Sequence, residues 1–419
     1  MGMHIWIDAR SLHAFEKIYS ITLLERLLRQ LFTLGVRQHV TVVLPPQLSL
    51  DRWLRHDFRP RFSLEYATVY SEAPLGTLVH ADKDVEHSLM VLEGDGIYDE
   101  RVLKTLLTSP HSLAIYGRNH EETPVAVVIH ASDRKFLTDH PLHLQQLFQQ
   151  DTPPGWLKTL SIDEMDSYIP ELRQTAVPML RKLRHKRCIR AIENAMYENT
   201  FKGVMDFIAT FIYRLPVREL TRWLAPTRVT PNQITAVSVF CSFAAIPLFA
   251  MGWLWTGLAV AFTFIIADSV DGKLARLTIR LSKVAGHVDH VTSPLFEACY
   301  YLAWGWYFSA GTFSTLPGQA GVLLSCFYVL DKITTSVFGL TFRRSLLDYQ
   351  PWDARFHLIA ARRTINLFIM TLGCLFQMPV VALYVITLWM FVTLLWHLSR
   401  FALHAYRRSI AAKTPASIA

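Results

Sequence analysis

Residues 268–276 read Asp-Ser-Val-Asp-Gly-Lys-Leu-Ala-Arg, and Asp289 follows them. The stretch lies in and beside an apolar segment that reads as membrane-spanning, where ionised carboxylates are costly, rare and usually functional. Asp268 and Asp271 are three residues apart, so on a helix they share one face. Hard divalent cations take oxygen ligands and often bridge carboxylates and phosphates. The pattern therefore predicts a metal site that receives a phosphate-bearing ligand.

The remaining residues of this stretch suit the same ligand. Gly272 and Ala275 leave room for a bulky group near the backbone, and Arg276 offers a planar cation that matches phosphate. Asp289 comes 13 residues after Arg276 and is expected to close the metal site from the next helix. A structural ion pair, for example between Asp271 and Arg276, is the alternative interpretation.

These residues resemble the signature of the CDP-alcohol phosphotransferase family, D-x2-D-G-x2-A-R followed by D-x3-D. The resemblance implies a metal-dependent transferase that uses Mg2+ or Mn2+. It also implies that the metal ligands are Asp268, Asp271 and Asp289, and that the CDP group is cradled by Gly272, Ala275 and Arg276.

The chain departs from this signature at its last position. The family's final Asp, the expected general base, falls on Ser293, which cannot act as such a base by itself. Glu297 lies one turn further along the same face and is one candidate replacement; His290 is another, and either could act through Ser293 or water. Pairing of Glu297 with a cation inside the helix bundle is the structural alternative, and the residues leave both open.

Composition divides the 419 residues into two halves. Half of the chain (51%) is hydrophobic, and the long apolar runs fall almost entirely within residues 229–405. We expect an α/β soluble N-terminal domain, followed by an all-α polytopic membrane domain of six transmembrane helices. The expected spans are 231–252, 255–275, 284–308, 318–342, 362–378 and 380–403.

Charge predicts the topology of these spans. The loops after the first, third and fifth spans carry no charged residue, whereas the opposite ends carry arginines and lysines. By the positive-inside rule both termini are cytoplasmic, which predicts a multi-pass protein of a bacterial-type inner membrane. Arg362 and Arg363 open the fifth span, and the resemblance implies a phosphate-binding role there; anchoring at the membrane end is the alternative. Asp331 and Lys332 are expected to pair inside the bundle.

Two segments connect the halves. Residues 161–202 are predicted to be a helical linker that contains a basic cluster at 181–190, and residues 203–226 an interfacial amphipathic helix. The membrane domain is expected over residues 227–410, with a helix starting at Thr230-Pro231.

Residues 1–160 alternate between strand-like and helix-like stretches. Strands are predicted at 4–7, 40–44, 88–92 and 125–129, and helices at 20–34 and 100–107. The Gly-Asp pair at Asp95 resembles that of sugar nucleotidyltransferases, where it would hold the catalytic metal. Residues 8–15 contain no glycine, although that family needs a glycine-rich phosphate loop there. The domain is therefore expected to be a degenerate nucleotidyltransferase-like domain.

The resemblance thus implies an enzyme of phospholipid biosynthesis. Its donor would be CDP-diacylglycerol or another CDP-alcohol, its acceptor an alcohol or alcohol phosphate, and its assembly a homodimer in the lipid bilayer. Two alternatives remain: a catalytically impaired CDP-lipid-binding protein, because of Ser293, and a bifunctional cytidylyltransferase/phosphotransferase. The net charge of +8 is not accompanied by a basic-aromatic motif, so nucleic acid is not expected as a partner. The 5 Cys are scattered without metal-ligand spacing and are expected to be free thiols.

Overall fold

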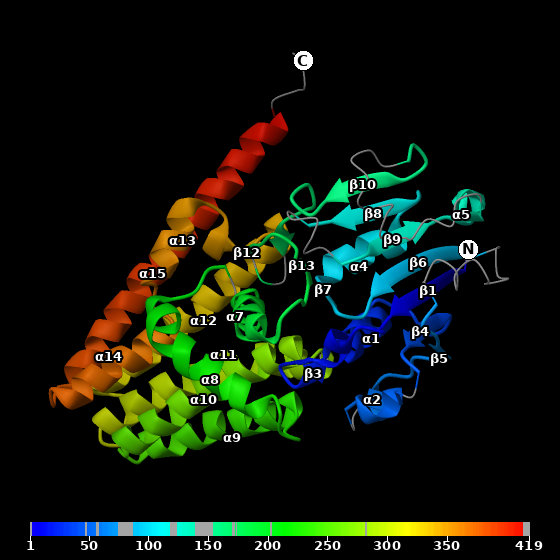
Figure 1. Ribbon diagram of the computed structural model, residues 1–419. Coiled ribbons are helices and arrows are strands. Elements are labelled where there is room, and N and C mark those ends of the chain that lie inside the picture. Colours follow the sequence, from blue (N-terminus) through cyan, green and yellow to red (C-terminus); the bar gives the residue numbers. More distant parts are fainter. Residues whose placement is uncertain are drawn as a thin grey trace. The chain divides into compact units, whose positions relative to one another are not determined.

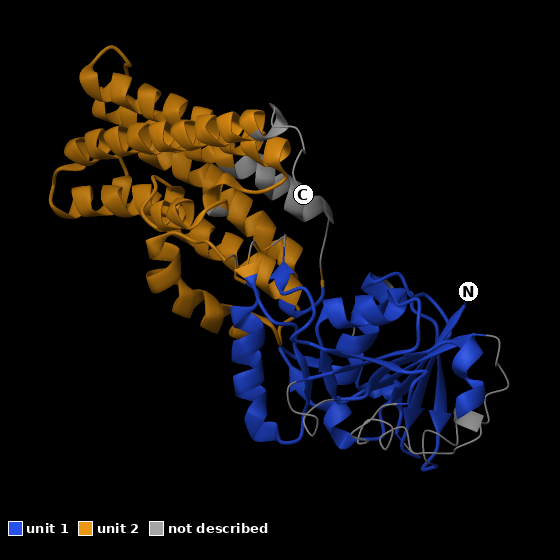
Figure 2. Ribbon diagram, turned by 90° about the horizontal axis from the view of Figure 1, so that it is seen from above, with its two compact units in different colours: residues 1–169, 175–200, 277–279 blue, residues 170–174, 201–276, 280–419 orange. Residues whose placement is uncertain are grey.

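The computed structural model describes residues 2–46, 48–55, 58–73, 87–117, 124–138, 154–169, 172, 174–201, 203–280 and 283–413. Within these ranges, the side chains of 59–60, 137–138, 283–293, 348 and 411–413 lie outside the description. The chain forms two units (Figure 2). Unit 1 comprises Met1–Ile169, Thr175–Thr200 and Leu277–Ile279; unit 2 comprises Pro170–Gln174, Phe201–Arg276 and Arg280–Ala419.

Unit 1 is built on a 7-stranded sheet of order β10-β8-β9-β6-β1-β4-β5 (Figure 1). Strand β9 runs antiparallel to both of its neighbours, and the other pairs are parallel. The strands are β1 (Met3–Asp8), β4 (Val40–Leu44), β5 (Tyr66–Tyr70), β6 (Ser88–Glu93), β8 (Leu113–Tyr116), β9 (Ala126–Ile129) and β10 (Lys158–Ser161).

Strands β4 and β6 are buried along their whole length, which explains why their sequences are mostly apolar. Every residue of β4 and of β6 is buried, as expected for parallel strands covered on both faces. Helices α1 (Leu23–Thr33) and α4 (Glu100–Thr108) begin at Thr22 and Asp99, whose side chains accept hydrogen bonds from backbone amides. The four predicted strands and the two predicted helices of this unit are therefore confirmed.

The prediction of a helical linker at residues 161–202 is wrong for its first part. The described residues there contain the short strands β11 (Tyr168–Ile169), β12 (Gln174–Thr175) and β13 (Leu180–Lys182), and only then helix α7 (Ile189–Glu198). Strand β13 pairs antiparallel with β7 (Gly96–Tyr98), so its backbone makes hydrogen bonds within a sheet and not within a helix. Pro178, just before β13, lacks an amide hydrogen and disfavours a helix.

Two buried arginines of α1 bind a distant part of the same unit. Arg26 donates to the carbonyl of Leu277 at 2.7 Å, and Arg29 donates to the carbonyl of Thr278 at 2.9 Å. Arg29 is fully buried and also pairs with Glu25 one turn earlier on α1. Each guanidinium would be costly to bury without such acceptors. The segment Leu277–Ile279 is therefore an integral part of unit 1.

Unit 2 is helical, and within its described residues four helices are long and apolar enough to cross a membrane: α9, α10, α12 and α15. Helices α11 and α14 occupy the other two predicted positions, where membrane spans stay a prediction. The bounds are α8 (Arg214–Leu224), α9 (Pro231–Ala250), α10 (Leu254–Leu277), α11 (Lys283–Phe308), α12 (Leu316–Phe342), α13 (Pro351–His357), α14 (Arg363–Leu375) and α15 (Pro379–Lys413).

Local sequence explains where the first of these helices begins. Thr230 and Gln233 form a reciprocal capping box in front of Pro231, which confirms the predicted start of α9. Helix α8 lies within the segment predicted to be interfacial and exposes Leu215 (58%) and Trp223 (69%), but its contact with a membrane stays a prediction.

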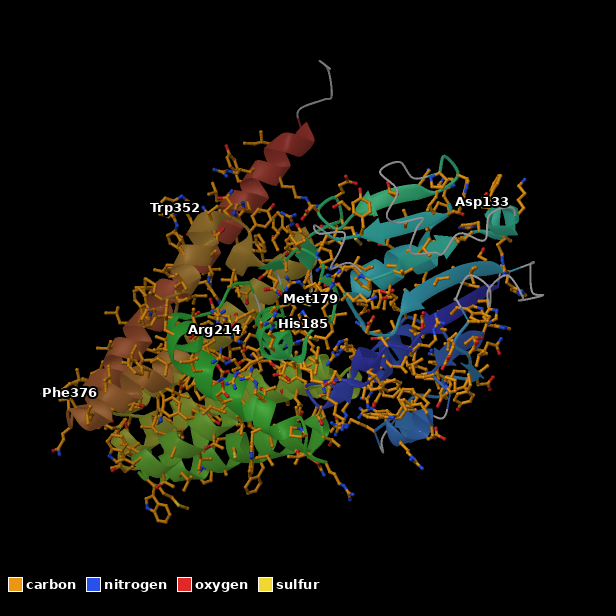
Figure 3. The ribbon with its side chains drawn as sticks, viewed as in Figure 1. Asp133, Met179, His185, Arg214, Trp352 and Phe376 are labelled. Carbon is orange, nitrogen blue, oxygen red and sulfur yellow. The ribbon has the colours of Figure 1, made fainter. Side chains whose placement is uncertain are left out.

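Helices α11 and α12 approach each other at glycines. A Cβ on Gly321 would lie 2.6 Å from the Cα of Gly305, so only glycine fits this crossing. Large apolar side chains lie on the outer surface, including Trp352 and Phe376, which are 64% and 69% exposed (Figure 3). Such exposure is expected for a surface that faces lipid.

Candidate functional site

Helix α10 carries both described aspartates of the candidate metal site. Asp268 is partly buried, with 19% of its side chain exposed, and its Oδ2 accepts a hydrogen bond from Nη2 of Arg363 at 2.9 Å. Asp271 lies one turn further along α10, and its Oδ2 accepts a hydrogen bond from the hydroxyl of Thr235 at 2.6 Å. The donors come from α14 and α9, so two other helices orient the α10 carboxylates.

Arg363 joins Asp268 to a second carboxylate. Its Nη1 lies 3.4 Å from Oε1 of Glu297 on α11, and its guanidinium carbon lies 4.2 Å from the centre of the Phe264 ring. Glu297 is 6% exposed. Its pairing with Arg363 is the structural alternative considered above.

The residues expected to receive the CDP group lie on the last turns of α10. A Cβ on Gly272 would lie 3.5 Å from Nη2 of Arg276, so the glycine leaves space beside the guanidinium. Nε of Arg276 is buried and has no hydrogen-bond partner among the described residues. Ala275 is buried, and its carbonyl accepts a hydrogen bond from the amide of Arg280, which ends the helix.

The remaining predicted site residues are carried by the first turns of α11. The side chains of Asp289, His290 and Ser293 lie outside the described residues. Among the side chains that are described, no three of His, Cys, Asp and Glu converge as a metal site. The predicted set of three aspartates therefore stays a prediction. The donor chemistry of Asp268 and Asp271 nonetheless fits Mg2+ or Mn2+, since both offer carboxylate oxygens from one helix face.

Basic residues gather around Glu297 in the same unit. Arg362 hydrogen-bonds to Nε2 of His357 at 2.5 Å. The expected pairing of Asp331 with Lys332 is wrong, because adjacent residues point to different sides of a helix. Asp331 instead pairs with Nδ1 of His397 at 2.5 Å, and Lys332 lies 5.0 Å from the centre of the Tyr328 ring. Glu297, Arg362 and Arg363 interact electrostatically with Lys332.

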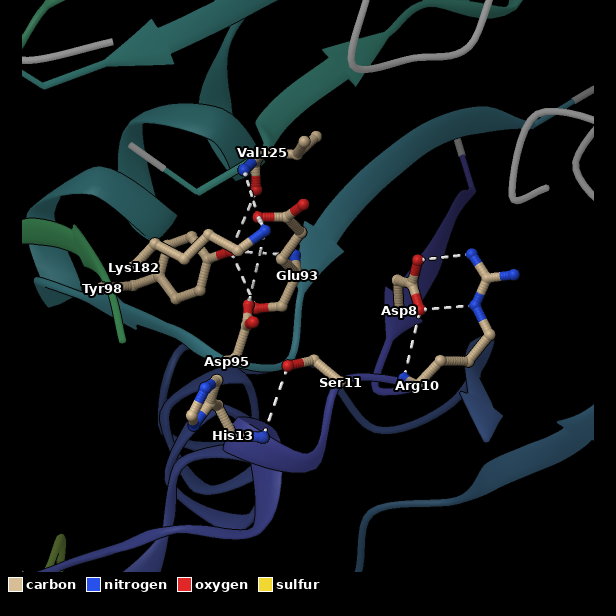
Figure 4. A network of polar contacts seen from close by, with 9 residues as sticks. All are labelled: Asp8, Arg10, Ser11, His13, Glu93, Asp95, Tyr98, Val125 and Lys182. Carbon is tan, nitrogen blue, oxygen red and sulfur yellow. Dashed lines mark hydrogen bonds and ion pairs between the residues drawn. The ribbon is translucent and has the colours of Figure 1, made fainter. Parts of the chain in front are cut away.

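Unit 1 has its own polar pocket, and Figure 4 shows the polar contacts made by several of its lining residues. It has a volume of about 530 Å³ and lies at the carboxyl ends of β1 and β6, where the strand order reverses direction. Ligands of open α/β sheets bind at such switch points. The charged residues that line it are Asp8, Arg10, Glu72, Glu93, Asp95 and Lys182.

Ion pairs organise this pocket. Lys182 of β13 lies 2.9 Å from Oε2 of Glu93 and 3.9 Å from Oδ1 of Asp95. Burial raises the pKa of Asp95, although Lys182 opposes the shift. Burial lowers the pKa of Lys182, but Glu93 and Asp95 outweigh it, so the net shift is upward. Lys182 belongs to the basic cluster of the predicted helical linker, but it lies on a strand and neutralises buried carboxylates.

The pocket is poorly suited to a nucleotide. Both side-chain oxygens of Asp8 accept hydrogen bonds from Arg10, at 2.8 and 2.6 Å. The cations are therefore already paired, and the lining carries four carboxylates against two cations. Together with the missing glycines, this charge disfavours a triphosphate. These features agree with a degenerate domain, which stays a prediction.

The motif on α10 resembles the signature of the CDP-alcohol phosphotransferase family, and part of the chain is similar to a curated relative. The relative is phosphatidylinositol phosphate synthase from Cutibacterium acnes, which is 30% identical over 87 residues. These residues are 20% of this chain and 42% of the relative, so the chain spans less than half of the relative's length. No family model matches the chain.

Two solved structures were also compared. The crystal structure of Mycobacterium tuberculosis phosphatidylinositol phosphate synthase with CDP-DAG bound is 16% identical and has a TM-score of 0.37, covering 44% of this chain and 92% of that chain. The crystal structure of HddC from Yersinia pseudotuberculosis is 14% identical and has a TM-score of 0.28, covering 38% and 90%. Both TM-scores are below 0.5, so neither similarity defines the fold of this chain.

Sequence reasoning missed Thr235. Its only sequence signal is its place about one turn after the Thr230-Pro231 start of the predicted helix. A lone Thr in an apolar span is usually bonded to its own helix, as Thr235 also is through the carbonyl of Pro231.

Proposed function

We propose that the protein transfers a phosphatidyl or phospho-alcohol group from a CDP-linked donor to an acceptor alcohol, with release of CMP. The observation that carries this proposal is the pair Asp268 and Asp271, which stand within the family signature and are held by donors from two other helices. In the reaction, the acceptor oxygen forms a bond to phosphorus while the bond from phosphorus to CMP breaks.

Asp268, Asp271 and Asp289 would hold Mg2+ or Mn2+, with Gly272, Ala275 and Arg276 accommodating the CDP group. A bound metal would neutralise the charge of the diphosphate and of the leaving CMP. The buried Nε of Arg276, which lacks a partner among the described residues, supports a ligand on that side chain.

The acceptor hydroxyl must lose a proton, and Ser293 alone does not provide a base. His290, which can accept a proton near neutral pH, is the candidate we favour. Glu297 remains the second candidate, although it already pairs with Arg363.

A phosphorylated acceptor fits the basic residues of unit 2. Lys332 has no salt bridge within the described part of the chain, whereas Arg362 and Arg363 are already engaged. A phosphate group placed among these three cations would be attracted by all of them. The same proposal includes the CDP-linked donor, six membrane spans, cytoplasmic termini in an inner membrane, and a homodimer.

The test is CMP release by the purified full chain in detergent, with CDP-diacylglycerol, Mg2+ and a panel of polyols and polyol phosphates. Release should depend on the acceptor and on Mg2+, fall more than about 100-fold in Asp268→Ala, and be stronger with phosphorylated acceptors. Glu219→Gln, at an exposed residue of α8, serves as the control. Undiminished release in Asp268→Ala would refute the proposed site.

Two alternatives have distinct outcomes in the same experiment. Replacement of the family's final Asp by Ser293 favours a protein that binds the donor without turnover. That protein would bind CDP-diacylglycerol in a metal-dependent way and release no CMP with any acceptor. A bifunctional enzyme would also release pyrophosphate from CTP in the presence of a polyol phosphate, which the acidic pocket of unit 1 disfavours.

A further inference from the structure

Both described aspartates of the candidate metal site are held by a donor from another helix. Thr235 of α9 binds Oδ2 of Asp271, and Arg363 of α14 binds Oδ2 of Asp268. Groups that hydrogen-bond to metal-ligating side chains orient the ligands and typically change metal affinity by about 10–100-fold. Thr235 and Arg363 are placed like such groups, because each hydrogen-bonds to an aspartate that is a candidate metal ligand.

The hydroxyl of Thr235 has two acceptors but only one hydrogen. It lies 3.1 Å from the carbonyl of Pro231 and 2.6 Å from the carboxylate of Asp271. A distance of about 2.6 Å is typical of a hydroxyl that donates to an ionised carboxylate, which is the stronger of the two bonds. The bond to Asp271 is therefore the main one.

Arg363 is fixed from two further sides. Glu297 lies 3.4 Å from its Nη1, and the Phe264 ring lies 4.2 Å below its guanidinium carbon. The side chain is only 17% exposed. Because the guanidinium is planar and held at both ends, it restricts the rotation of Asp268. Oδ1 of Asp268 accepts no hydrogen bond from the residues that the structure describes.

We propose that Thr235 and Arg363 are positioning residues that fix the carboxylates of Asp271 and Asp268 for a divalent cation. Glu297 then serves to anchor Arg363. This inference rests on the proposed metal-dependent function. It assigns to Arg363 a role in ordering a metal ligand, in addition to the attraction it would exert on an acceptor phosphate.

The test is Mn2+ binding to the full chain in detergent, titrated by electron paramagnetic resonance without nucleotide or lipid. Thr235→Val keeps the shape of the side chain and loses the hydroxyl, whereas Thr235→Ser keeps the hydroxyl and is the matched control. Arg363→Lys keeps the charge and loses the planar fork. Asp271→Asn shows the effect of losing a ligand, and Thr235→Ala repeats the test if the valine variant does not fold.

Thr235→Val and Arg363→Lys should each weaken Mn2+ binding about 10-fold, and Thr235→Ser should bind as wild type does. Wild-type affinity in Thr235→Val or Thr235→Ala, alongside weak binding in Asp271→Asn, would overturn the inference and leave the proposed function intact. If the wild type binds no Mn2+ and releases no CMP, the proposed function fails and the inference fails with it.

Discussion

Removing the ammonium group of Lys182 should destabilise unit 1 more than removing a similar group at its surface. Lys182 lies 2.9 Å from Glu93 and 3.9 Å from Asp95, and 26% of its side chain is exposed against 9% and 4% for the carboxylates. Lys182→Met would leave both carboxylates buried without their cation.

The magnitude follows from this burial. Breaking a fully buried ion pair costs about 3–5 kcal/mol, and the partial exposure of Lys182 reduces this to about 2–3 kcal/mol. Lys186 is the matched control, since it lies 2.7 Å from Glu16 but is 74% exposed. Lys186→Met should therefore cost less than about 1 kcal/mol, as exposed ion pairs do.

The assay is proteolysis of the full chain in detergent across a urea gradient, following loss of the N-terminal fragment. With a slope of about 2 kcal/mol per molar urea, the midpoint for Lys182→Met should fall by about 1 M. Glu93 and Asp95 raise the pKa of Lys182 and outweigh the opposite effect of burial. The stability that Lys182 contributes is therefore present below the ordinary lysine pKa and is lost as pH rises through the pKa in the folded state. If the urea midpoints of Lys182→Met and Lys186→Met shift by equal, small amounts, burial does not decide how much stability is lost, and the reasoning is refuted.

Three further outcomes are expected. Burial raises the pKa of Asp95, so the stability that this residue contributes is present below the unfolded aspartate pKa and is lost as pH rises through the folded value. In the same urea assay, Asp95→Asn should therefore gain stability relative to wild type as the pH is raised from 4 to 7.5. A difference in stability between variant and wild type that does not change with pH would contradict this. Gly321→Ala should lower the thermal stability of unit 2 by forcing α11 and α12 apart. Gly339→Ala is the control and should not, because the nearest atom to a Cβ there is the carbonyl oxygen of Arg344 at 4.0 Å. Equal melting temperatures for the two variants would count against the glycine crossing. Leu92→Ala, at a fully buried residue of β6, should cost unit 1 about 2–5 kcal/mol in urea unfolding, while Leu12→Ala, 75% exposed, should leave the midpoint unchanged.

Much of the fold could be predicted because its strands and helices carry local signals. Four of the five residues of Val40–Leu44 are apolar because β4 is buried on both faces. Thr230-Pro231 starts α9 because capping depends on neighbouring residues. The strand β13 carries no such signal. It is fixed by pairing with β7, which lies far away in the sequence.

The candidate site was predictable to a similar degree. Asp268 and Asp271 could be recognised from their spacing, because one helical turn brings them to the same face. Their partners could not, because the hydrogen bond from Arg363 to Asp268 joins residues 95 apart in the chain. The sequence placed Arg363 near a phosphate, and tertiary packing adds two carboxylate neighbours that no local pattern encodes.

The hydrogen bonds that Arg26 and Arg29 donate to the carbonyls of Leu277 and Thr278 bear on the synthesis of the chain. These acceptors follow their arginines by 251 and 249 residues. A ribosome adds about 5–20 residues per second, so roughly 10–50 s pass before Leu277 and Thr278 are made. Until then, two cations of α1 lack partners that they have in the finished unit. The N-terminal unit can therefore gain these two hydrogen bonds only after Leu277 and Thr278 at the end of α10 have been translated.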